Sequence, residues 1–488
     1  MLTKSTYTQA ITCLKTLWRD KYKNESQSTT DKTTQTRLET GKQVGVLACQ
    51  LFPNGRKIEF SSKVQMVMKT KSWIEEGVEC IYEATFVFEN LLVMVDVLKV
   101  TSDGLEIYEV KSSTKVKEIN LHDVAFQYYV LGQLGYEIKK AFVVHIDGAY
   151  VRGDELELNK LFILTDVLDE VVYFQDEIPD KIDEIESALA DEINEPIVQE
   201  ECFCDFCKEA MGIPKYSIFN IFNRGTKKFT ELFEQGVINI EDVPDDFEMT
   251  KRQRLKVENW KEQRTDINHE KIAEFVEGIT YPLYHLDFET FQQAVPQWEG
   301  IRPYMQIPFQ YSLHIEYEDG ELEHQEFLAS EHEDPRESLV QKLVEDIPNG
   351  VMVMTYNMSF EKGVLRALSD DFKSFSSDLM GIHDNIIDLM MPFQKGYYMT
   401  PKMKGSYSIK YVLPALVPEQ KDAYANLNLI QNGADAMNAF PLLIHLGENE
   451  KVEMREALLV YCKLDTLAMV WIFKELRNVL KHDNMPYL

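Results

Sequence analysis

The most constraining feature of this chain is the segment Tyr281–Thr290, YPLYHLDFET, which carries two carboxylates at alternate positions. In a strand, residues i and i+2 point to the same face, so Asp287 and Glu289 project together while Leu286 and Phe288 face the opposite side. Two adjacent carboxylates repel each other, and a divalent cation is the usual compensation when such a pair is buried. The alternative is the solvated face of an edge strand.

The residues that follow predict an α/β domain. After the first strand the pattern predicts two further strands, a helix and an apolar strand, over residues 309–317, 321–329, 334–347 and 350–357. The next helix carries Glu361 on its first turn. A long amphipathic helix over residues 450–480 places Tyr461 and Asp465, four positions apart, on one face.

This order of elements, with D-x-E on the first strand and Y-x-x-x-D on the last helix, resembles the DEDD family of 3′–5′ exonucleases in its tyrosine subtype. The resemblance covers about residues 280–480 and implies an RNase H-like fold. It implies that Asp287, Glu289 and Asp465 bind two divalent ions, Mg²⁺ or Mn²⁺, and that Tyr461 orients the attacking water. Glu361 would complete the acidic set, although the family usually has Asp at that position.

A second set of polar residues lies in the N-terminal part of the chain. LLVMVDVLKV and LEIYEVKSS predict a hairpin with Asp96 on its first arm and Glu109 and Lys111 on one face of its second arm. The helix that follows contains Gln127 and Tyr128. Taken alone, E-x-K is more typical of an ordinary cross-strand salt-bridge face.

Together these residues resemble the PD-(D/E)XK nucleases of the RecB-like branch. The resemblance implies that Asp96 and Glu109, with the carbonyl of Val110, hold one or two metal ions. Lys111 would position the water and stabilise the negative charge of the transition state, and Gln127 and Tyr128 would position the site or the strand. Many such nucleases also use a histidine from an early helix, whereas this chain has none before His122.

Four cysteines flank this nuclease-like segment. Cys13 precedes it, and Cys202, Cys204 and Cys207 follow it within ECFCDFC. Three thiols so close together in a reducing compartment favour a metal or cluster over disulfides. In the related nucleases of CRISPR adaptation, one early and three late cysteines hold an iron–sulfur cluster, so the resemblance implies a 4Fe–4S cluster here. Tetrahedral zinc is the alternative.

Two smaller features are basic. Residues 250–264, TKRQRLKVENWKEQR, form either a phosphate-binding strip or, more commonly, a solvated helix face. Residues 395–410, KGYYMTPKMKGSYSIK, mix bases with aromatic side chains. They can stack on single-stranded bases beside the C-terminal site, or they form a plain loop.

Length and charge limit the remaining possibilities. A chain of 488 residues predicts two or three domains, here residues 1–213, 214–278 and 279–488, with the middle part a helical connector. The formal net charge of -30 argues against a general DNA-coating protein, but not against a nucleic-acid enzyme with a local basic groove. We find neither a membrane-length apolar run nor a signal peptide, and therefore expect a cytoplasmic protein.

The whole chain resembles a bacterial family in which a RecB-like iron–sulfur nuclease domain precedes a domain without assigned function. We therefore expect a metal-dependent nuclease, acting on single-stranded DNA as an exonuclease with two active sites. Two alternatives stay open. One is an RNA 3′–5′ exonuclease that uses mainly the C-terminal site, and the other is a nucleic-acid-binding scaffold with one or both sites inactive.

Overall fold

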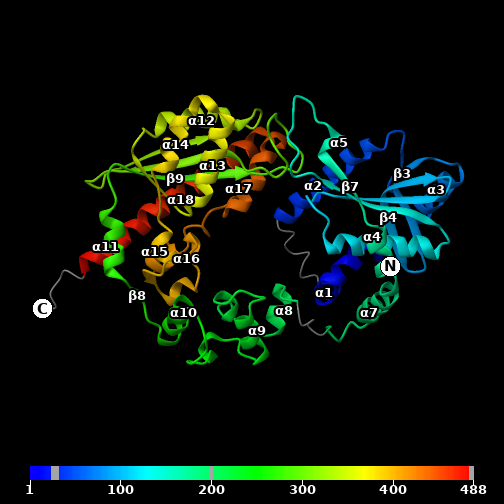
Figure 1. Cartoon of the computed structure of the whole chain (residues 1–488), viewed down its shortest axis with the longest axis horizontal. Coiled ribbons are helices and arrows are strands. Elements are labelled where there is room, and N and C mark those ends of the chain that lie inside the picture. Colours follow the sequence, from blue (N-terminus) through cyan, green and yellow to red (C-terminus); the bar gives the residue numbers. More distant parts are fainter. Residues whose placement is uncertain (24–31, 197–201, 483–488) are drawn as a thin grey trace. The chain divides into compact units, whose positions relative to one another are not determined.

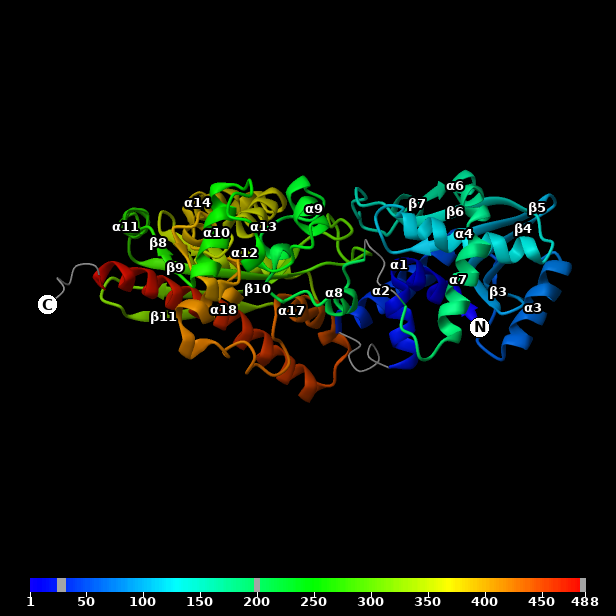
Figure 2. The same cartoon turned by 90° about the horizontal axis from the view of Figure 1, so that it is seen from below.

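The computed structural model describes residues 1–23, 32–196 and 202–482, and it is a mixed α/β structure with several sheets. The chain forms two compact units (Figures 1 and 2). The first unit comprises Met1–Gly212 and Gln293–Met305, and the second comprises Ile213–Gln292 and Gln306–Leu488. Residues 214–278, which we expected to be a separate connector, thus cluster with the second unit.

A seven-stranded sheet forms the centre of the first unit, in the order β2-β3-β4-β5-β6-β7, with β1 paired to the start of β4. Its strands are β1 (Leu2–Thr3), β2 (Arg56–Lys57), β3 (Cys80–Phe88), β4 (Leu91–Thr101), β5 (Gly104–Lys111), β6 (Ile138–Ile146) and β7 (Phe162–Asp166). The predicted hairpin is confirmed, because β4 and β5 pair antiparallel with Val97 opposite Tyr108.

Helices cover both faces of this sheet. The helices of this unit are α1 (Lys4–Tyr22), α2 (Lys32–Ala48), η2 (Cys49–Leu51), α3 (Lys63–Glu75), α4 (Glu118–Gln133), α5 (Leu158–Leu161), α6 (Leu168–Tyr173), η3 (Phe174–Asp176), α7 (Ile178–Ala190) and α8 (Asp205–Ala210). Ile107 packs into the core beneath α4, whereas Tyr108 packs into a second core with α2 on the other face. Since side chains alternate along β5, Glu109 and Lys111 share the face of Ile107 and point toward α4.

A five-stranded sheet forms the centre of the second unit, in the order β11-β10-β9-β12-β13. The strands of this unit are β8 (Asp266–Ile267), β9 (Leu283–Phe291), β10 (Ile307–Glu316), β11 (Leu322–Leu328), β12 (Met352–Thr355), β13 (Ile386–Asp388) and β14 (Tyr398–Met399). β9 pairs antiparallel with β10 and parallel with β12. The short β8 pairs with β14, so the segment expected to be purely helical also contributes one strand.

Most of the second unit is helical. Its helices are η4 (Ile218–Asn220), α9 (Lys227–Glu234), η5 (Ile240–Asp242), α10 (Lys251–Glu262), α11 (His269–Glu277), α12 (Pro335–Asp346), α13 (Met358–Asp371), η6 (Lys373–Phe375), α14 (Ser376–Asp384), α15 (Met391–Gln394), η7 (Pro401–Met403), α16 (Ile409–Leu416), η8 (Pro418–Gln420), α17 (Gly433–Ala439), η9 (Phe440–His445) and α18 (Glu448–His482). The predicted helices around Glu361 and over residues 450–480 are thus confirmed as α13 and α18.

The two faces of β9 have different environments, as the alternation in YPLYHLDFET predicts. Leu286 and Phe288 pack into an apolar core with α12, α13 and α14. On the opposite face α18 lies along β9 and β10 (Figures 1 and 2). Asp287 and Glu289 therefore point into the layer between the sheet and α18, and not into solvent at a sheet edge.

No helix among the described residues is both long enough and apolar enough to cross a membrane.

Candidate metal centres

The first unit brings its predicted polar residues into one hydrogen-bonded cluster. The buried carboxylate of Glu109 accepts from Lys111 Nζ at 2.7 Å and from Gln127 Nε2 at 2.8 Å. Asp96 Oδ2, from the neighbouring strand β4, accepts from the backbone N–H of Val110 at 2.8 Å. The predicted set of Asp96, Glu109, Lys111 and Gln127 thus meets at one place on β4, β5 and α4.

Two members of this cluster were not among the predicted site residues. Lys4, at the start of α1, places its Nζ 2.8 Å from Glu109 Oε2 and 3.2 Å from Asp96 Oδ1. Asp123, one turn before Gln127 on α4, accepts from Lys111 Nζ at 2.5 Å. Asp123 stands four positions before Gln127, so helical spacing is a signal that could have found it. Lys4 is 105 positions from Glu109 and has no local signal.

The charges in this cluster shift the pKa values of two of its carboxylates, Asp96 and Glu109, in opposite directions. Burial and the charge of Glu109 raise the pKa of Asp96 to about 6. Burial also opposes ionisation of Glu109, but Lys111 and Lys4 outweigh it and hold the pKa of Glu109 well below its usual range. Three carboxylates and two ammonium groups share this site. The cation between Asp96 and Glu109 is an amino group that the chain itself supplies.

Among the described residues, Tyr128 forms no hydrogen bond with these polar groups. It is half-buried and packs against the hydrophobic core of the first unit, next to α4's buried face. Its predicted role in positioning the site or a strand stays a prediction.

Four thiols meet in the first unit. The Sγ atoms of Cys13, Cys202, Cys204 and Cys207 all lie within 4.8 Å of one another, so the group can hold a metal. Cys13 interrupts α1 with extended backbone angles, φ -165° and ψ 103°, and this break directs its thiol to the others. Cys204 caps the start of α8, where its Sγ accepts from the backbone N–H of Cys207 at 3.4 Å.

The geometry and chemistry of this group fit a thiolate-bound metal. The Cys13 Sγ atom is 3.6 Å from Cys204 Sγ and 3.7 Å from Cys207 Sγ. A tetrahedral ion with bonds of about 2.3 Å has ligand sulfurs about 3.8 Å apart. Although burial raises it, hydrogen bonds from the backbone of Cys207 and from Thr16 bring the pKa of Cys204 down to about 7. A thiol of this kind is readily available as thiolate.

The second unit brings Asp287, Glu289 and Asp465 to one pocket of about 270 Å³, which Tyr461 also lines. Ligand atoms of Asp287, Glu289 and Cys462 lie within 4.8 Å of one another, so this group too can hold a metal. Cys462 is fully buried. Its Sγ lies 3.8 Å from Asp287 Oδ2.

Two further residues of this site lie outside the D-x-E and Y-x-x-x-D motifs, which therefore did not predict them. Tyr424, in an irregular segment after α16, donates its hydroxyl hydrogen to Asp465 Oδ1 at 2.6 Å. Lys410 is exposed on α16, and its charge acts on Glu289 and Asp465.

Burial and mutual repulsion dominate the electrostatics of this pocket. The pKa of Asp287 lies well above its usual range because Asp287 is buried and faces the charges of Asp465, Glu289 and Glu361. Burial and Asp465 raise the pKa of Glu289 in the same way. Burial raises the pKa of Asp465 to about 6, although Tyr424 opposes the shift. Such clustered carboxylates need a cation or a proton to be ionised together.

Glu361 lies outside the set of described residues that line this pocket. It is 1% exposed on the first turn of α13, and its Oε2 has no hydrogen-bond partner among the described residues. Burial raises the pKa of Glu361 to about 8. Asp388, at the end of β13, has a structural role, because its Oδ1 accepts from the backbone N–H groups of Asn357 and Met390.

Comparisons with known proteins give one match. Residues 284–408 match a family model described as a domain of unknown function, DUF2779. The matched segment includes Asp287, Glu289 and Glu361 and ends before Tyr424, Tyr461 and Asp465. Neither the curated proteins nor the solved structures contain a match to the chain.

Proposed function

We propose that this protein is a metal-dependent nuclease that hydrolyses phosphodiester bonds of single-stranded DNA from an end. One observation carries the proposal: Asp287, Glu289 and Asp465 converge in a buried pocket where their negative charge has few opposing cations. Carboxylate oxygens in this arrangement fit Mg²⁺ or Mn²⁺. Bound there, divalent ions would supply an activated water and would stabilise charge on the phosphoryl oxygens.

Two tyrosines of the chain would orient a metal ligand and the attacking water. Tyr424 holds Asp465 through its hydroxyl and so fixes the orientation of one carboxylate ligand. Tyr461 lines the same pocket, and burial together with the charge of Asp465 keeps the pKa of Tyr461 well above its usual range. Its hydroxyl therefore stays protonated and can orient a water by donating a hydrogen bond. This arrangement is consistent with a DEDD-type site on an RNase H-like fold.

The first unit would form a second nuclease site, of the PD-(D/E)XK type. Asp96 and Glu109 would be the metal ligands, and Lys111 would position the water and stabilise the negative charge of the transition state. Gln127 holds Glu109 and Asp123 in place through its amide. A divalent ion at this site would have to displace Lys4 Nζ from Asp96 and Glu109.

The four thiols would stabilise the first unit by holding a metal centre. The resemblance to RecB-like nucleases favours a 4Fe–4S cluster, whereas sulfur separations of 3.6 and 3.7 Å favour a single tetrahedral ion such as Zn²⁺. Protein purified without oxygen distinguishes the two. A brown protein with iron and sulfide is expected for the cluster, and a colourless protein with stoichiometric zinc would exclude it.

The proposal is tested by digestion of 5′- and 3′-labelled single-stranded DNA and RNA with Mg²⁺ or Mn²⁺. Wild type is compared with Glu109→Gln, Asp287→Asn and the double variant. We expect stepwise 3′–5′ shortening that Asp287→Asn reduces by at least about 10²-fold, since removing one charge-stabilising group costs this much. If the double variant digests every substrate as fast as wild type, the proposal is wrong.

The same experiment separates the alternatives. Faster digestion of RNA than of DNA by the Asp287-dependent activity identifies an RNA exonuclease. Loss of all activity in Glu109→Gln alone makes the first unit the working nuclease. Metal-independent binding without digestion identifies a scaffold.

A further inference from the structure

A second cleft in the second unit is rich in cations and amides and lies next to the carboxylate pocket. It has a volume of about 940 Å³ and is lined mainly by α10 and by the loop between η7 and α16. Three of its lining residues are basic: Arg252, Lys256 and Lys404. None of the described residues that line it carries a carboxylate, although acids outnumber bases by 81 to 51 in the chain.

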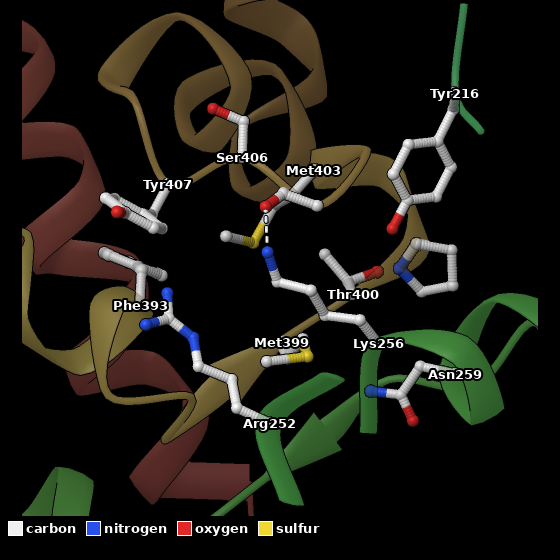
Figure 3. Close-up of a pocket in the computed structure, with 12 residues that line it drawn as sticks. Tyr216, Arg252, Lys256, Asn259, Phe393, Met399, Thr400, Met403, Ser406 and Tyr407 are labelled. Atoms are coloured by element: carbon white, nitrogen blue, oxygen red, sulfur yellow. Dashed lines mark hydrogen bonds between the residues drawn. The ribbon is translucent and has the colours of Figure 1, made fainter. Parts of the chain in front are cut away.

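The two residues of α10 that supply cations to the cleft, Arg252 and Lys256, lack acidic partners in the part of the chain that the structure describes. Among the described residues, neither Arg252 nor Lys256 forms an ion pair with a carboxylate. Lys256 Nζ instead donates to the carbonyl oxygen of Gly405 at 2.6 Å, as Figure 3 shows. By contrast Lys261, on the same helix, pairs with Asp245 at 2.8 Å. In the basic segment 250–264, Lys261 is thus neutralised by an acid of the protein, whereas Arg252 and Lys256 line the cleft.

Aromatic and amide groups accompany these cations. The guanidinium of Arg252 lies 5.1 Å from the centre of the Tyr407 ring, and Figure 3 draws both, with Lys256, among the residues that line one pocket. Asn220, Asn223 and Gln253 also line the cleft. Cations with an aromatic ring and amide groups are the side chains that bind the phosphates and bases of single strands.

The electrostatics of Lys256 agree with an anionic ligand. Burial and the neighbouring charge of Arg252 lower the pKa of Lys256 to about 8. A phosphate beside both side chains would remove this repulsion.

The cleft and the carboxylate pocket are contiguous. Tyr356 and Ile409 line both of them. The Tyr356 hydroxyl donates to the carbonyl oxygen of Tyr407 at 2.7 Å, which fixes the loop that carries the aromatic side of the cleft. A strand bound in the cleft can thus continue toward Asp287 and Glu289.

We propose that this cleft is the binding site for a single-stranded nucleic acid, with Arg252 and Lys256 on its phosphates and Tyr407 beside a base. The inference rests on the proposed nuclease function and assigns its substrate-holding surface, to which α10 contributes the charge. An acidic peptide would satisfy the same cations, but it would leave the aromatic ring and the contiguity with the carboxylates without a role.

The test is equilibrium binding of a fluorescent 12-nucleotide single strand to the full chain without added divalent ions. Digestion is prevented by Asp287→Asn with Glu109→Gln, and this background is compared with the same protein carrying Arg252→Gln and Lys256→Gln. We expect at least about 10-fold weaker binding at low salt. We also expect a slope of log K against log salt reduced by about 1.4, which corresponds to two phosphate contacts on a single strand.

Matched controls keep the result specific to the cleft. Lys251→Gln removes one charge from an exposed position at the start of the same helix, outside the cleft, and should change binding less than twofold. Lys256→Arg retains the charge and should retain binding, which separates lost charge from misfolding. A duplex of the same sequence and polyglutamate are the competitors.

The outcomes are distinct from those for the nuclease activity. If the double cleft variant binds as tightly as the Lys251→Gln control, the inference is wrong even when digestion is intact. If polyglutamate or the duplex competes as well as the single strand, the assignment to a single strand is wrong. If the cleft variant loses binding and the native chain never digests, the binding site stands and the proposed nuclease function fails.

Discussion

At the scale of single residues, the first-unit cluster shows how the chain stabilises buried acids without an added ion. Lys4 Nζ lies against both Asp96 and Glu109, at the place where the proposed metal would bind. Burial lowers the pKa of Lys4, but the charges of Asp96 and Glu109 hold it well above its usual value. Lys4 therefore remains a cation at neutral pH, and divalent ions compete with it.

Replacing Lys4 should make this competition measurable. We expect Lys4→Met to lower the free energy of unfolding of the metal-free protein by about 3 kcal/mol, since it removes a cation from the buried Glu109 and from the half-buried Asp96. Mn²⁺ should then stabilise the variant more than it stabilises wild type. Thermal unfolding with and without Mn²⁺ checks both. Lys71→Met, which removes an exposed ammonium 3.9 Å from Glu75, is the control and should change little. Equal Mn²⁺ shifts in wild type and Lys4→Met would contradict the competition.

Glu361 should make the stability of the metal-free protein depend on pH. Its folded-state pKa of about 8 lies above the ordinary 4.5, so the folded protein holds the proton more tightly than the unfolded chain. Stability must then fall as pH rises from about 4.5 to about 8, by at most about 1.4 kcal/mol per pH unit. Glu361→Gln cannot ionise. The difference in unfolding free energy between variant and wild type should therefore grow across this range in favour of the variant. Parallel pH profiles from urea unfolding would show that Glu361 is not buried as an acid.

At the scale of elements, helix α18 is held on the sheet by a polar network next to the carboxylates. The Thr466 hydroxyl lies 2.7 Å from His314 Nδ1 and 2.8 Å from Ser312 Oγ, and all three side chains are buried. Asp465, the adjacent residue, is thereby fixed relative to β9 and β10. The network explains why a polar face of the sheet tolerates a covering helix.

Thr466→Val should break this network with little change in volume. His314 and Ser312 would each lose a buried partner, at a cost of about 1–3 kcal/mol in unfolding free energy. Thr466→Ser keeps the hydroxyl and should cost less. Urea unfolding of the three proteins measures the difference. A valine variant as stable as the serine variant would mean that the hydroxyl contributes nothing.

The break in α1 at Cys13 makes a prediction about the thiol group. Cys13→Ser should lower the bound metal from stoichiometric amounts toward zero and loosen the contacts between α1 and α8. Metal analysis and limited proteolysis measure the two effects. Cys49→Ala is the matched control, because Cys49 lies outside the four-thiol group. Full metal content in Cys13→Ser would remove Cys13 from the ligand set.

Part of the fold and of the sites could be predicted from the alternation of side chains along strands and from the spacing of residues along helices. They predicted β4, β5, β9 and α18, and the faces on which Glu109, Asp287 and Asp465 lie. They could not predict Lys4 or Tyr424, whose partners come from distant parts of the chain. Nor could they predict that Gln293–Met305, between β9 and β10, packs with the first unit. Such contacts depend on tertiary packing, to which no local periodicity corresponds.

At the scale of the whole molecule, each proposed site is built from the residues of one unit. The cluster around Glu109 and the four thiols belong to the first unit, and the carboxylate pocket and the basic cleft belong to the second. Each unit has hydrophobic cores of its own. Perturbations at sites without shared partners are additive, so the two metal sites should respond independently.

Calorimetry can measure this independence. We expect two unfolding transitions for the metal-free protein, and Mn²⁺ at 100 times its dissociation constant should stabilise each unit by about 2.7 kcal/mol. Asp287→Asn should abolish the Mn²⁺ shift of one transition only, and Glu109→Gln that of the other, because each substitution removes a ligand from one unit. The double variant should lose both shifts while keeping both transitions. A single substitution that abolishes both shifts would show that the two units bind metal cooperatively, although the residues of each site belong to one unit.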